Sequence, residues 1–426
     1  MQQVDLVAAV VDGIPFPKNS ASGRSPELES VVKDGSAEGI SILLTDTESA
    51  MPDLWSTQPQ KLRCPTIGTV TFQFEAKLDL NCTAPPTNPP KQVWQSFQLP
   101  VANTLFQNGR TSTLLAQRWR RSTASATESE MIQVRNTHML NQKLHINGFP
   151  RSSHAIIPEL PLSAITYPRT IAASGGNVIK ALEVPNGSKA GLSVPASTEL
   201  EESVSMWNES QNLPAQPAMV WALVTPRESH LDHRRLPSMN LRSALGSGSR
   251  LLKVISGGGG WGAKKGLLAL DPEIEYSKYH DESEPIFDFD NDIDFAQRLA
   301  FRDVVRRGDV VTFYIHDRVN GSTSRAQDNS SPDFRESTTK PSIMLETIPS
   351  ELGTKLAPKL NGVGIYPWYA RNHFGMASES MVLAIHRDDE GCAAQPRSGQ
   401  GHTIVRTKID VPYTHCLIGS EASSLA

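Results

Sequence analysis

The sequence predicts a mixed α/β or α+β fold, with two sheet-containing regions joined by an irregular middle segment. Short apolar runs bounded by turn residues, typical of strands, occur in residues 1–125 and again in 216–426. Helical patterns lie between some of these runs. Residues 126–215 carry many Pro and Gly turn signals. We therefore expect an N-terminal α/β region over 1–125, an irregular and helical connection over 126–215, and a C-terminal mixed-sheet region over 216–426.

Three strands and one helix are expected in the N-terminal region. Residues 4–11 and 40–44 are continuous apolar runs, the pattern of strands covered on both faces. Residues 69–76 alternate apolar and polar side chains, the pattern of a half-exposed strand. The segment 112–121 ends in Arg-Trp-Arg-Arg, and predicts a short helix whose cationic end suits the negative pole of the helix dipole.

The remaining elements follow from the same patterns. Helices are expected over 177–183, from Ser197 to about residue 208, and over 295–307, where Gly308 stops the last one. Strands are expected at 218–225, 250–255, 310–315, 381–386 and 402–409. The last two strands should pair antiparallel. The polar stretch 318–342 predicts a flexible loop.

Composition and charge argue against some classes of function. The chain has 41 basic and 45 acidic residues and a formal net charge of −4. This balance argues against a broad basic face for nucleic acid, although a local patch stays open. The longest apolar runs are about a third of the roughly 20 residues that a transmembrane helix needs, so we expect a soluble protein without a membrane partner.

The expected compartment is intracellular. The first residues lack the basic leader of a signal peptide and the arginines of a mitochondrial presequence. Four cysteines without a Cys-x-x-Cys spacing indicate neither a zinc ribbon nor a redox motif. We expect a cytoplasmic protein, or a mitochondrial one if the true start lies upstream of Met1.

The strongest candidate for chemistry is the glycine-rich loop that follows the strand expected at 250–255. A glycine run lets backbone N–H groups converge on an anion, and two lysines would add positive charge. The candidate anion-binding residues are Ser256, Gly257, Gly258, Gly259, Gly260, Gly262, Lys264 and Lys265. Ala263 stands where a Walker A loop requires lysine, and four consecutive glycines satisfy Gly-x-Gly-x-x-Gly almost automatically. The alternative is a tight structural corner packed under Trp261.

Two polar clusters resemble parts of metal sites: the acidic run Asp288, Asp290 and Asp292, and the pair His230 and His233. Ile293 stands where a calcium loop needs glycine for its turn. The histidine pair has no third ligand nearby in the sequence. We therefore expect no metal site, but an acidic loop that caps the following helix and an exposed charged loop.

Other residues offer weaker signals. His316 and His386 are expected at strand ends, where catalytic side chains often lie, but no Gly-x-Ser-x-Gly turn marks a nucleophile. The Arg118–Arg121 segment joins cations to an aromatic ring and suits RNA or an acidic partner, although it offers few phosphate contacts. Capping of a helix end is the other interpretation of that segment. Cys416 is expected to be a buried thiol beside the surface imidazole of His415.

One motif resembles a known group of sequences. Ser-Gly-Gly-Gly-Gly-Trp-Gly at 256–262, followed by Lys-Gly-Leu-Leu-Ala-Leu-Asp-Pro-Glu at 265–273, resembles a motif of uncharacterised filamentous-fungal proteins. Residues 195–201 and 99–109 are similar to the same group. That family has no established activity, so the resemblance implies no catalytic residue and no cofactor. Residues 10–15, with 39–44, also resemble the sensory ligand-binding FIST domain.

The function that the sequence predicts is a non-catalytic intracellular protein that binds a ligand or partner through the glycine-rich loop. The partner would be a phosphorylated small molecule or a protein, and no cofactor is indicated. One alternative is an enzyme on a phosphorylated or nucleotide-like substrate, with His316 or His386 as acid or base. Another is an organellar RNA- or ribosome-associated factor that uses Arg118–Arg121.

Overall fold

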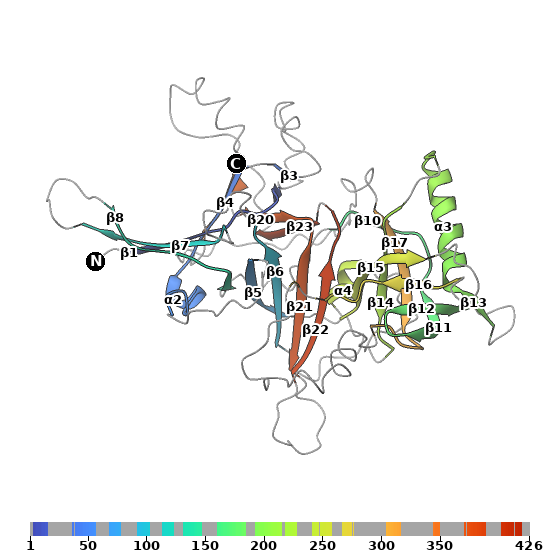
Figure 1. The fold of residues 1–426 in the computed structure, drawn as a ribbon. Coiled ribbons are helices and arrows are strands. Elements are labelled where there is room, and N and C mark those ends of the chain that lie inside the picture. Colours follow the sequence, from blue (N-terminus) through green and yellow to red (C-terminus); the bar gives the residue numbers. More distant parts are fainter. Residues whose placement is uncertain are drawn as a thin grey trace, which may run out of the picture.

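The computed structural model describes residues 3–15, 36–37, 39–56, 68–77, 92–102, 113–122, 131–146, 160–184, 192–214, 218–227, 241–246, 248–257, 266–274, 276, 304–316, 344–349, 370–371, 373–388, 402–412 and 414–419. Within these residues the protein is mostly β, with 23 strands and three helices (Figure 1). The expected α/β or α+β mixture is therefore wrong. The segment 126–215, expected to be irregular, contains strands β8 to β13 and a helix.

The central sheet has five strands in the order β22-β21-β6-β5-β9. Their bounds are β5 Thr69–Lys77, β6 Gln92–Pro100, β9 Asn141–Ile146, β21 Met381–Asp388 and β22 His402–Ile409. All neighbours run antiparallel except β5 and β9, which are parallel. Because β6 pairs with β21, strands from the first and the last quarter of the chain share this sheet.

A second sheet closes on itself. Six antiparallel strands follow the order β17-β11-β12-β16-β15-β14, and β14 pairs back onto β17. Their bounds are β11 Arg169–Gly175, β12 Val178–Glu183, β14 Val220–Thr225, β15 Arg250–Gly257, β16 Leu268–Leu270 and β17 Val310–His316. Two short strands extend it: β10 Leu162–Ala164 on β17, and β13 Ser193–Pro195 on β12.

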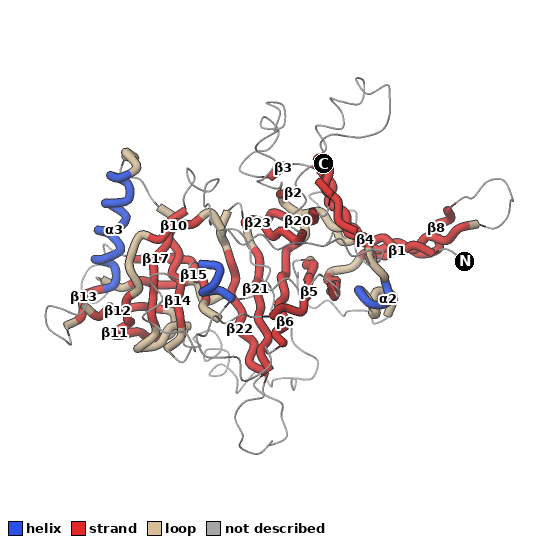
Figure 2. The backbone as a smooth tube through the Cα atoms, turned by 180° about the vertical axis from the view of Figure 1, so that it is seen from behind, coloured by secondary structure: helices blue, strands red, loops and turns tan. Residues whose placement is uncertain are grey.

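A third sheet of three strands projects away from these two, in the order β1-β7-β8. Its strands are β1 Gln3–Ala8, β7 Leu115–Arg121 and β8 Met131–His138, and we call it the projecting sheet. Figures 1 and 2 show it extending from the central sheet on the side opposite the closed sheet. Among the residues that the structure describes, Val7 and Ala116 at its base contact the main core.

Smaller elements complete the described structure. The strands are β2 Ile14–Pro15 with β3 Ser36–Ala37, β4 Gly39–Leu44 with β18 Met344–Pro349 and β19 Ala370–Arg371, and β20 His373–Ser378 with β23 Thr414–Gly419. The helices are α2 Thr47–Ala50, α3 Ala196–Ser210 and α4 Leu241–Gly246. None of the helices in the described ranges is long and apolar enough to cross a membrane.

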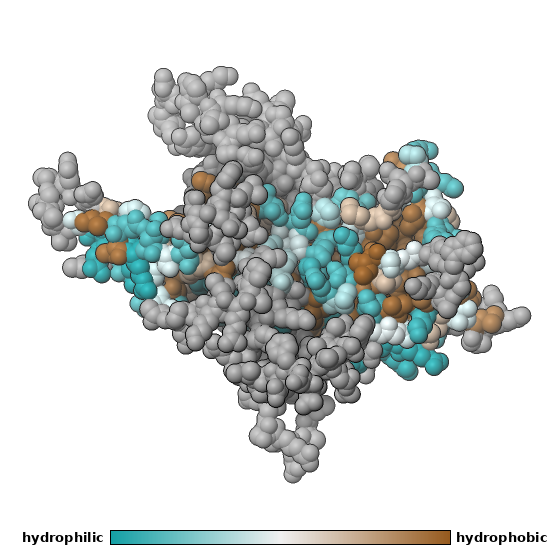
Figure 3. All heavy atoms as spheres, viewed as in Figure 1, coloured by the Kyte–Doolittle hydropathy of each residue, from teal (hydrophilic) through white to brown (hydrophobic). Residues whose placement is uncertain are grey.

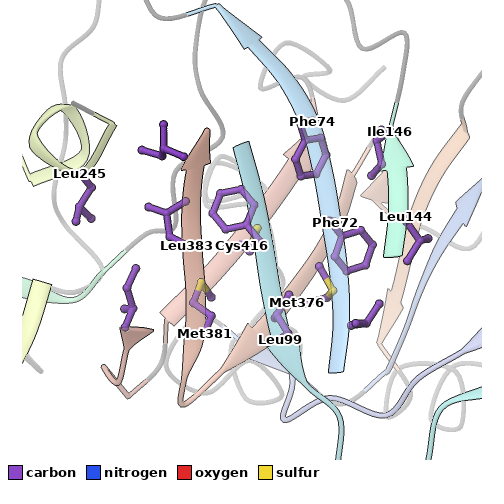
Figure 4. Close-up of a cluster of buried hydrophobic side chains, with 14 of the residues drawn as sticks. Phe72, Phe74, Leu99, Leu144, Ile146, Leu245, Met376, Met381, Leu383 and Cys416 are labelled. Carbon is purple, nitrogen blue, oxygen red and sulfur yellow. The ribbon is translucent and has the colours of Figure 1, made fainter. Parts of the chain in front are cut away.

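Two hydrophobic cores follow from this layout. One fills the closed sheet and includes Ile171, Leu252 and Phe313, with Leu200 of α3 packed against it. The other lies on the central sheet and includes Phe72, Leu99 and Leu383 (Figure 4), and it extends to the outer face of the closed sheet. On β14, Trp221 and Leu223 belong to the second core, whereas Ala222 and Val224 belong to the first. Both faces of β14 are buried, which explains its continuous apolar run.

Two expected helices are strands in the structure. Residues 115–121 form β7, which pairs with β1 and β8, and 178–183 form β12. The second error has a clear cause: register shifts in the β11–β12 pair bury Ile179 and Leu182, which lie three positions apart as they would on a helix face. The missed signal was Gly176-Asn177, a two-residue hairpin loop with Gly176 at φ 62°.

The expected strands at 218–225, 250–255, 310–315, 381–386 and 402–409 are confirmed, and the last two pair antiparallel. The helix from Ser197 is also confirmed, with Pro195 rather than Ser197 before its first residue. The expected double-sided burial of 4–11 and 40–44 is wrong, because large apolar side chains stay exposed on both strands: Val4 (52%) on β1, and Ile40 (64%) and Leu44 (55%) on β4. Residues 295–303 and 318–342 lie outside the described residues.

Candidate functional site

The glycine-rich loop connects two neighbouring strands of the closed sheet. Ser256 and Gly257 end β15 and pair with Ala269 and Leu268 of β16. The other predicted anion-binding residues lie outside the described residues: Gly258, Gly259, Gly260, Gly262, Lys264 and Lys265. The described ends of the loop therefore form an antiparallel pair, and the anion site itself stays a prediction.

Close packing accounts for the glycines at the two described ends of this loop. A Cβ on Gly257 would lie 2.2 Å from Cδ2 of Leu268, a residue that is buried in the core of the closed sheet. Gly266 has φ +89°, and a Cβ there would lie 2.5 Å from Cβ of Pro195. The carbonyl of Gly266 also accepts a hydrogen bond of 3.1 Å from the amide of Ser197 at the start of α3. These two positions support the interpretation of the loop as a structural corner.

The other sequence candidates do not converge on one site. His316 ends β17 in the closed sheet, with its ring centroid 6.5 Å from that of Trp221, whereas His386 lies on β21 of the central sheet. The acidic run at 288–292 and the pair His230 and His233 lie outside the described residues. Among the residues that are described, no three His, Cys, Asp or Glu side chains form a metal-binding group.

Cys416 is a buried free thiol, as expected. It is fully buried within the core of the central sheet, and this burial raises the pKa of the thiol to about 12. The thiolate is the reactive form of cysteine, so this side chain is suited to packing rather than to nucleophilic chemistry.

A polar network lies where the β20–β21 turn meets the end of β22. The hydroxyl of Tyr276 donates to Ser380 Oγ at 2.6 Å, and Ser380 Oγ donates to the carboxylate of Asp410. Lys408 Nζ lies 2.7 Å from a carboxylate oxygen of Glu273 and 3.2 Å from one of Asp410. Burial raises the pKa of Tyr276 and keeps its phenol protonated. The network joins three segments of the chain, and each of its charged groups is already paired.

A cavity of about 370 Å³ opens on the outer face of β14 and β17. It is lined by Ala164, Ile165, Thr166, Tyr167, Pro168, Leu223, Thr225, Ala244, Thr312 and Tyr314. Burial raises the pKa of Tyr314. Among the described residues that line it, none carries a charge.

The projecting sheet is held at its base by an arginine–aspartate pair. Arg118 Nε and Nη2 donate to the two carboxylate oxygens of Asp5, at 2.7 and 2.9 Å. The hydrogen bonds from Arg118 lower the pKa of the Asp5 carboxyl. The guanidinium groups of Arg118 and Arg135 lie 4.9 and 4.7 Å from the ring centroid of Trp55, which follows α2. The expected helix-capping role of this basic segment is wrong, since Arg118 crosslinks strands instead.

The other parts of the projecting sheet leave large apolar side chains exposed. Val4 and Leu6 on β1 are 52% and 46% exposed, and Ile132 and Val134 on β8 are 50% and 51% exposed. Val4 pairs with Trp119 of β7. Because side chains alternate along a strand, these two lie on the face opposite to Asp5 and Arg118. Figure 3 shows apolar and polar side chains intermixed on this part of the surface.

The charge of the projecting sheet has the opposite sign to that of the whole chain. Its three strands contain four arginines and one aspartate, a formal charge of +3, and no lysine or glutamate. The whole chain carries −4. The sheet thus combines arginine, tryptophan and exposed aliphatic side chains, a composition enriched in protein interfaces.

No known protein family, curated protein or solved structure matches the chain. The two family resemblances noted from the sequence therefore stay predictions. Sequence analysis singled out Arg118–Arg121 but missed Asp5, Trp55 and Arg135. Their link to Arg118 arises from strand pairing over long sequence separations. The run Leu-Ala-Gln-Arg-Trp-Arg-Arg in 115–121 does not alternate apolar and polar residues, so it carries no local signal for a strand.

Proposed function

We propose that the chain is an intracellular, non-catalytic binding protein, and that the projecting sheet docks onto a partner protein. The observation that carries this proposal is the exposure of Val4, Leu6, Ile132 and Val134 on a sheet whose described contacts with the main core lie at its base. Large apolar side chains gathered on one exposed element are typical of interaction sites.

The free energy expected from covering the exposed side chains favours a docking role. Each of the four side chains is about half exposed, so covering one would contribute roughly 1 kcal/mol. The arginines add charge-assisted hydrogen bonds, which are stronger than neutral ones. Trp55 contacts the guanidinium groups of Arg118 and Arg135 and supplies an aromatic ring beside them.

The experiment compares three tagged proteins by in-cell crosslinking and quantitative mass spectrometry. The docking variant carries Val4→Thr, Leu6→Thr and Val134→Thr. The matched control carries Met206→Thr, Leu213→Thr and Ile255→Thr, which are exposed apolar positions on α3, on the turn after it and on β15. The third protein is the wild type.

We expect a defined set of proteins to crosslink to the wild type and to the control, and to be lost with the docking variant. Equal crosslinking of all three proteins would contradict the proposal. Thermal unfolding of the purified variants checks that the substitutions leave the fold intact.

A further inference from the structure

Strand β8 ends the strand order of the projecting sheet. It pairs with β7 on one side, and no strand in the described ranges pairs with its other side. Seven of its eight residues are exposed, and Thr137 is half-buried. The outer edge of such a strand presents backbone N–H and C=O groups that a further strand can pair with.

The sequence of β8 lacks most features that protect an edge. It contains no lysine, no proline and no acidic residue. The exception is a register shift between Arg118 and Trp119 of β7, which places a bulge at Val134. The bulge leaves two stretches for regular pairing, Met131–Gln133 and Arg135–His138, so that an added strand would meet a short ladder on each side of it.

The positive charges around β8 favour an added strand with acidic side chains. Arg135 lies on β8 itself, and the exposed Arg120 lies opposite Ile132 on β7. The acidic side chain in these three strands, Asp5, is already bound to Arg118. An acidic segment would be attracted to this edge, whereas a second copy of β8 would bring like charges together.

We propose that β8 takes up an extended segment of a partner protein as an additional strand, and that this segment alternates acidic and apolar residues. The inference rests on the function proposed above and adds the chemistry of the partner. The register places Arg120, Arg135 and Ile132 on one face of the sheet, so the acidic side chains of the added strand lie on that face. Its apolar side chains lie on the opposite face, beside the exposed Met131. The aliphatic exposure and the small number of arginines favour a protein over a nucleic acid, for which affinity grows with the number of phosphate contacts.

The test uses the purified full chain and fluorescein-labelled peptides in an anisotropy titration. The probe is a peptide of alternating Glu and Val. Its controls are a peptide of alternating Lys and Val, a Glu-Val peptide with N-methylated backbone amides, and a single-stranded RNA oligonucleotide. Hydrogen exchange of residues 131–138, with and without the probe, reports on backbone pairing.

We expect the Glu-Val peptide to bind and to slow amide exchange in β8, and the three controls to bind weakly. Arg120→Glu should weaken binding about tenfold, since a lost charge-assisted hydrogen bond is worth at least one decade in affinity. Arg135→Glu should weaken binding by a similar factor. Arg135 also contacts Trp55, so if its substitution unfolds the sheet, Arg120→Glu still tests the role of charge. Arg307→Glu, at an exposed arginine outside the projecting sheet, should leave binding unchanged.

Three results would overturn the inference. The first is equal binding of the N-methylated peptide, or unchanged exchange in β8, because strand addition requires backbone pairing. The second is RNA binding that exceeds peptide binding and falls in the arginine variants. The third is no peptide binding while the docking variant still loses its crosslinked partners, which would leave the docking function intact and reject only the acidic strand.

Discussion

Arg118 and Asp5 are 113 positions apart in the sequence, and their side chains form two hydrogen bonds, at 2.7 and 2.9 Å. The carboxylate of Asp5 is 3% exposed. The pair joins β1 to β7 within the projecting sheet, and Trp55 packs against the arginine. One partly buried ion pair thus links two strands of the proposed docking element.

Asp5→Asn should loosen the projecting sheet. The substitution removes the charge that Arg118 pairs with, and loss of a charged partner in a partly buried hydrogen bond costs roughly 1–3 kcal/mol. We expect faster hydrogen exchange in β1 and β7 and a lower midpoint of urea unfolding. Unchanged exchange in both strands would show that the pair does not hold the sheet.

The Asp5–Arg118 pair also predicts that the stability of the projecting sheet decreases at acidic pH. The hydrogen bonds from Arg118 lower the pKa of Asp5 below its ordinary value of 3.8. The folded state therefore binds this proton less tightly than the unfolded state, so the contribution to stability is complete well above pH 3.8 and is lost as the pH falls below it. The protection factor of the β1 amides, which divides out the intrinsic pH dependence of exchange, should fall in the wild type as the pH falls over this range and stay level in Asp5→Asn.

Gly266→Ala should destabilise the closed sheet by roughly 1–3 kcal/mol, because alanine is strained at φ +89° and its Cβ would meet Pro195. Gly175→Ala is the control, since its Cβ would make ordinary contacts of 3.5 Å or more with Lys180. Urea unfolding of both variants checks the difference. Equal urea-unfolding midpoints for the two variants would mean that the backbone around residue 266 relaxes to accommodate the alanine.

Asp410→Ala should destabilise the protein by roughly 1–3 kcal/mol, because it removes the acceptor of Ser380 and one partner of Lys408. Burial opposes the charge on Lys408, but its hydrogen bonds and charge interactions with Glu273 and Asp410 prevail and raise its pKa. Glu273→Gln is the control. Its carboxylate is exposed, so we expect roughly 1 kcal/mol or less in urea unfolding.

Cys416 should resist alkylation in the folded protein. Burial raises its pKa to about 12, so almost no thiolate forms at neutral pH. A variant with serine at Cys64, Cys82 and Cys392 isolates this thiol. We expect iodoacetamide to react only as fast as the protein unfolds, and a folded-state rate equal to that of a free thiol would contradict the burial.

Lys264→Ala with Lys265→Ala tests the anion site predicted from the sequence. If the backbone amides of the glycine-rich loop bind an anion, phosphate or nucleotides should raise the melting temperature of the wild type and have less effect on the double variant. Thermal-shift titration provides the measurement. Equal shifts, or none, would assign the loop to packing, as at Gly257 and Gly266.

The sequence predicts individual strands better than it predicts the fold. The runs at 220–225 and 310–316 are strands because both of their faces are buried, and such runs carry their own signal. Strand β7 was missed because its short, arginine-rich run lacks apolar–polar alternation, and its strand conformation comes from pairing with β1 and β8. The closure of the sheet by β14 and β17 depends on strands that are about 90 residues apart, which no local pattern records.

Of the two candidate sites, one was visible in the sequence and the other was not. The glycine-rich loop was visible in the sequence because its composition is unusual, and the packing at Gly257 and Gly266 shows that unusual composition can also meet a steric need. The projecting sheet was invisible as a unit, since its strands come from residues 3–8, 115–121 and 131–138. Only Arg118–Arg121 was identified, and its setting comes from pairing across the chain.

Because β6 pairs with β21, the central sheet cannot be completed until the last part of the chain has been synthesised. Phe97 on β6 faces Leu383 on β21, and both are buried in one core. Residues 69–146 therefore emerge from the ribosome with an apolar surface that stays uncovered until about 240 further residues have been added, when β21 is complete. Long-range pairing of this kind slows folding and exposes the nascent chain to aggregation, so this protein is expected to depend on chaperones while it is made.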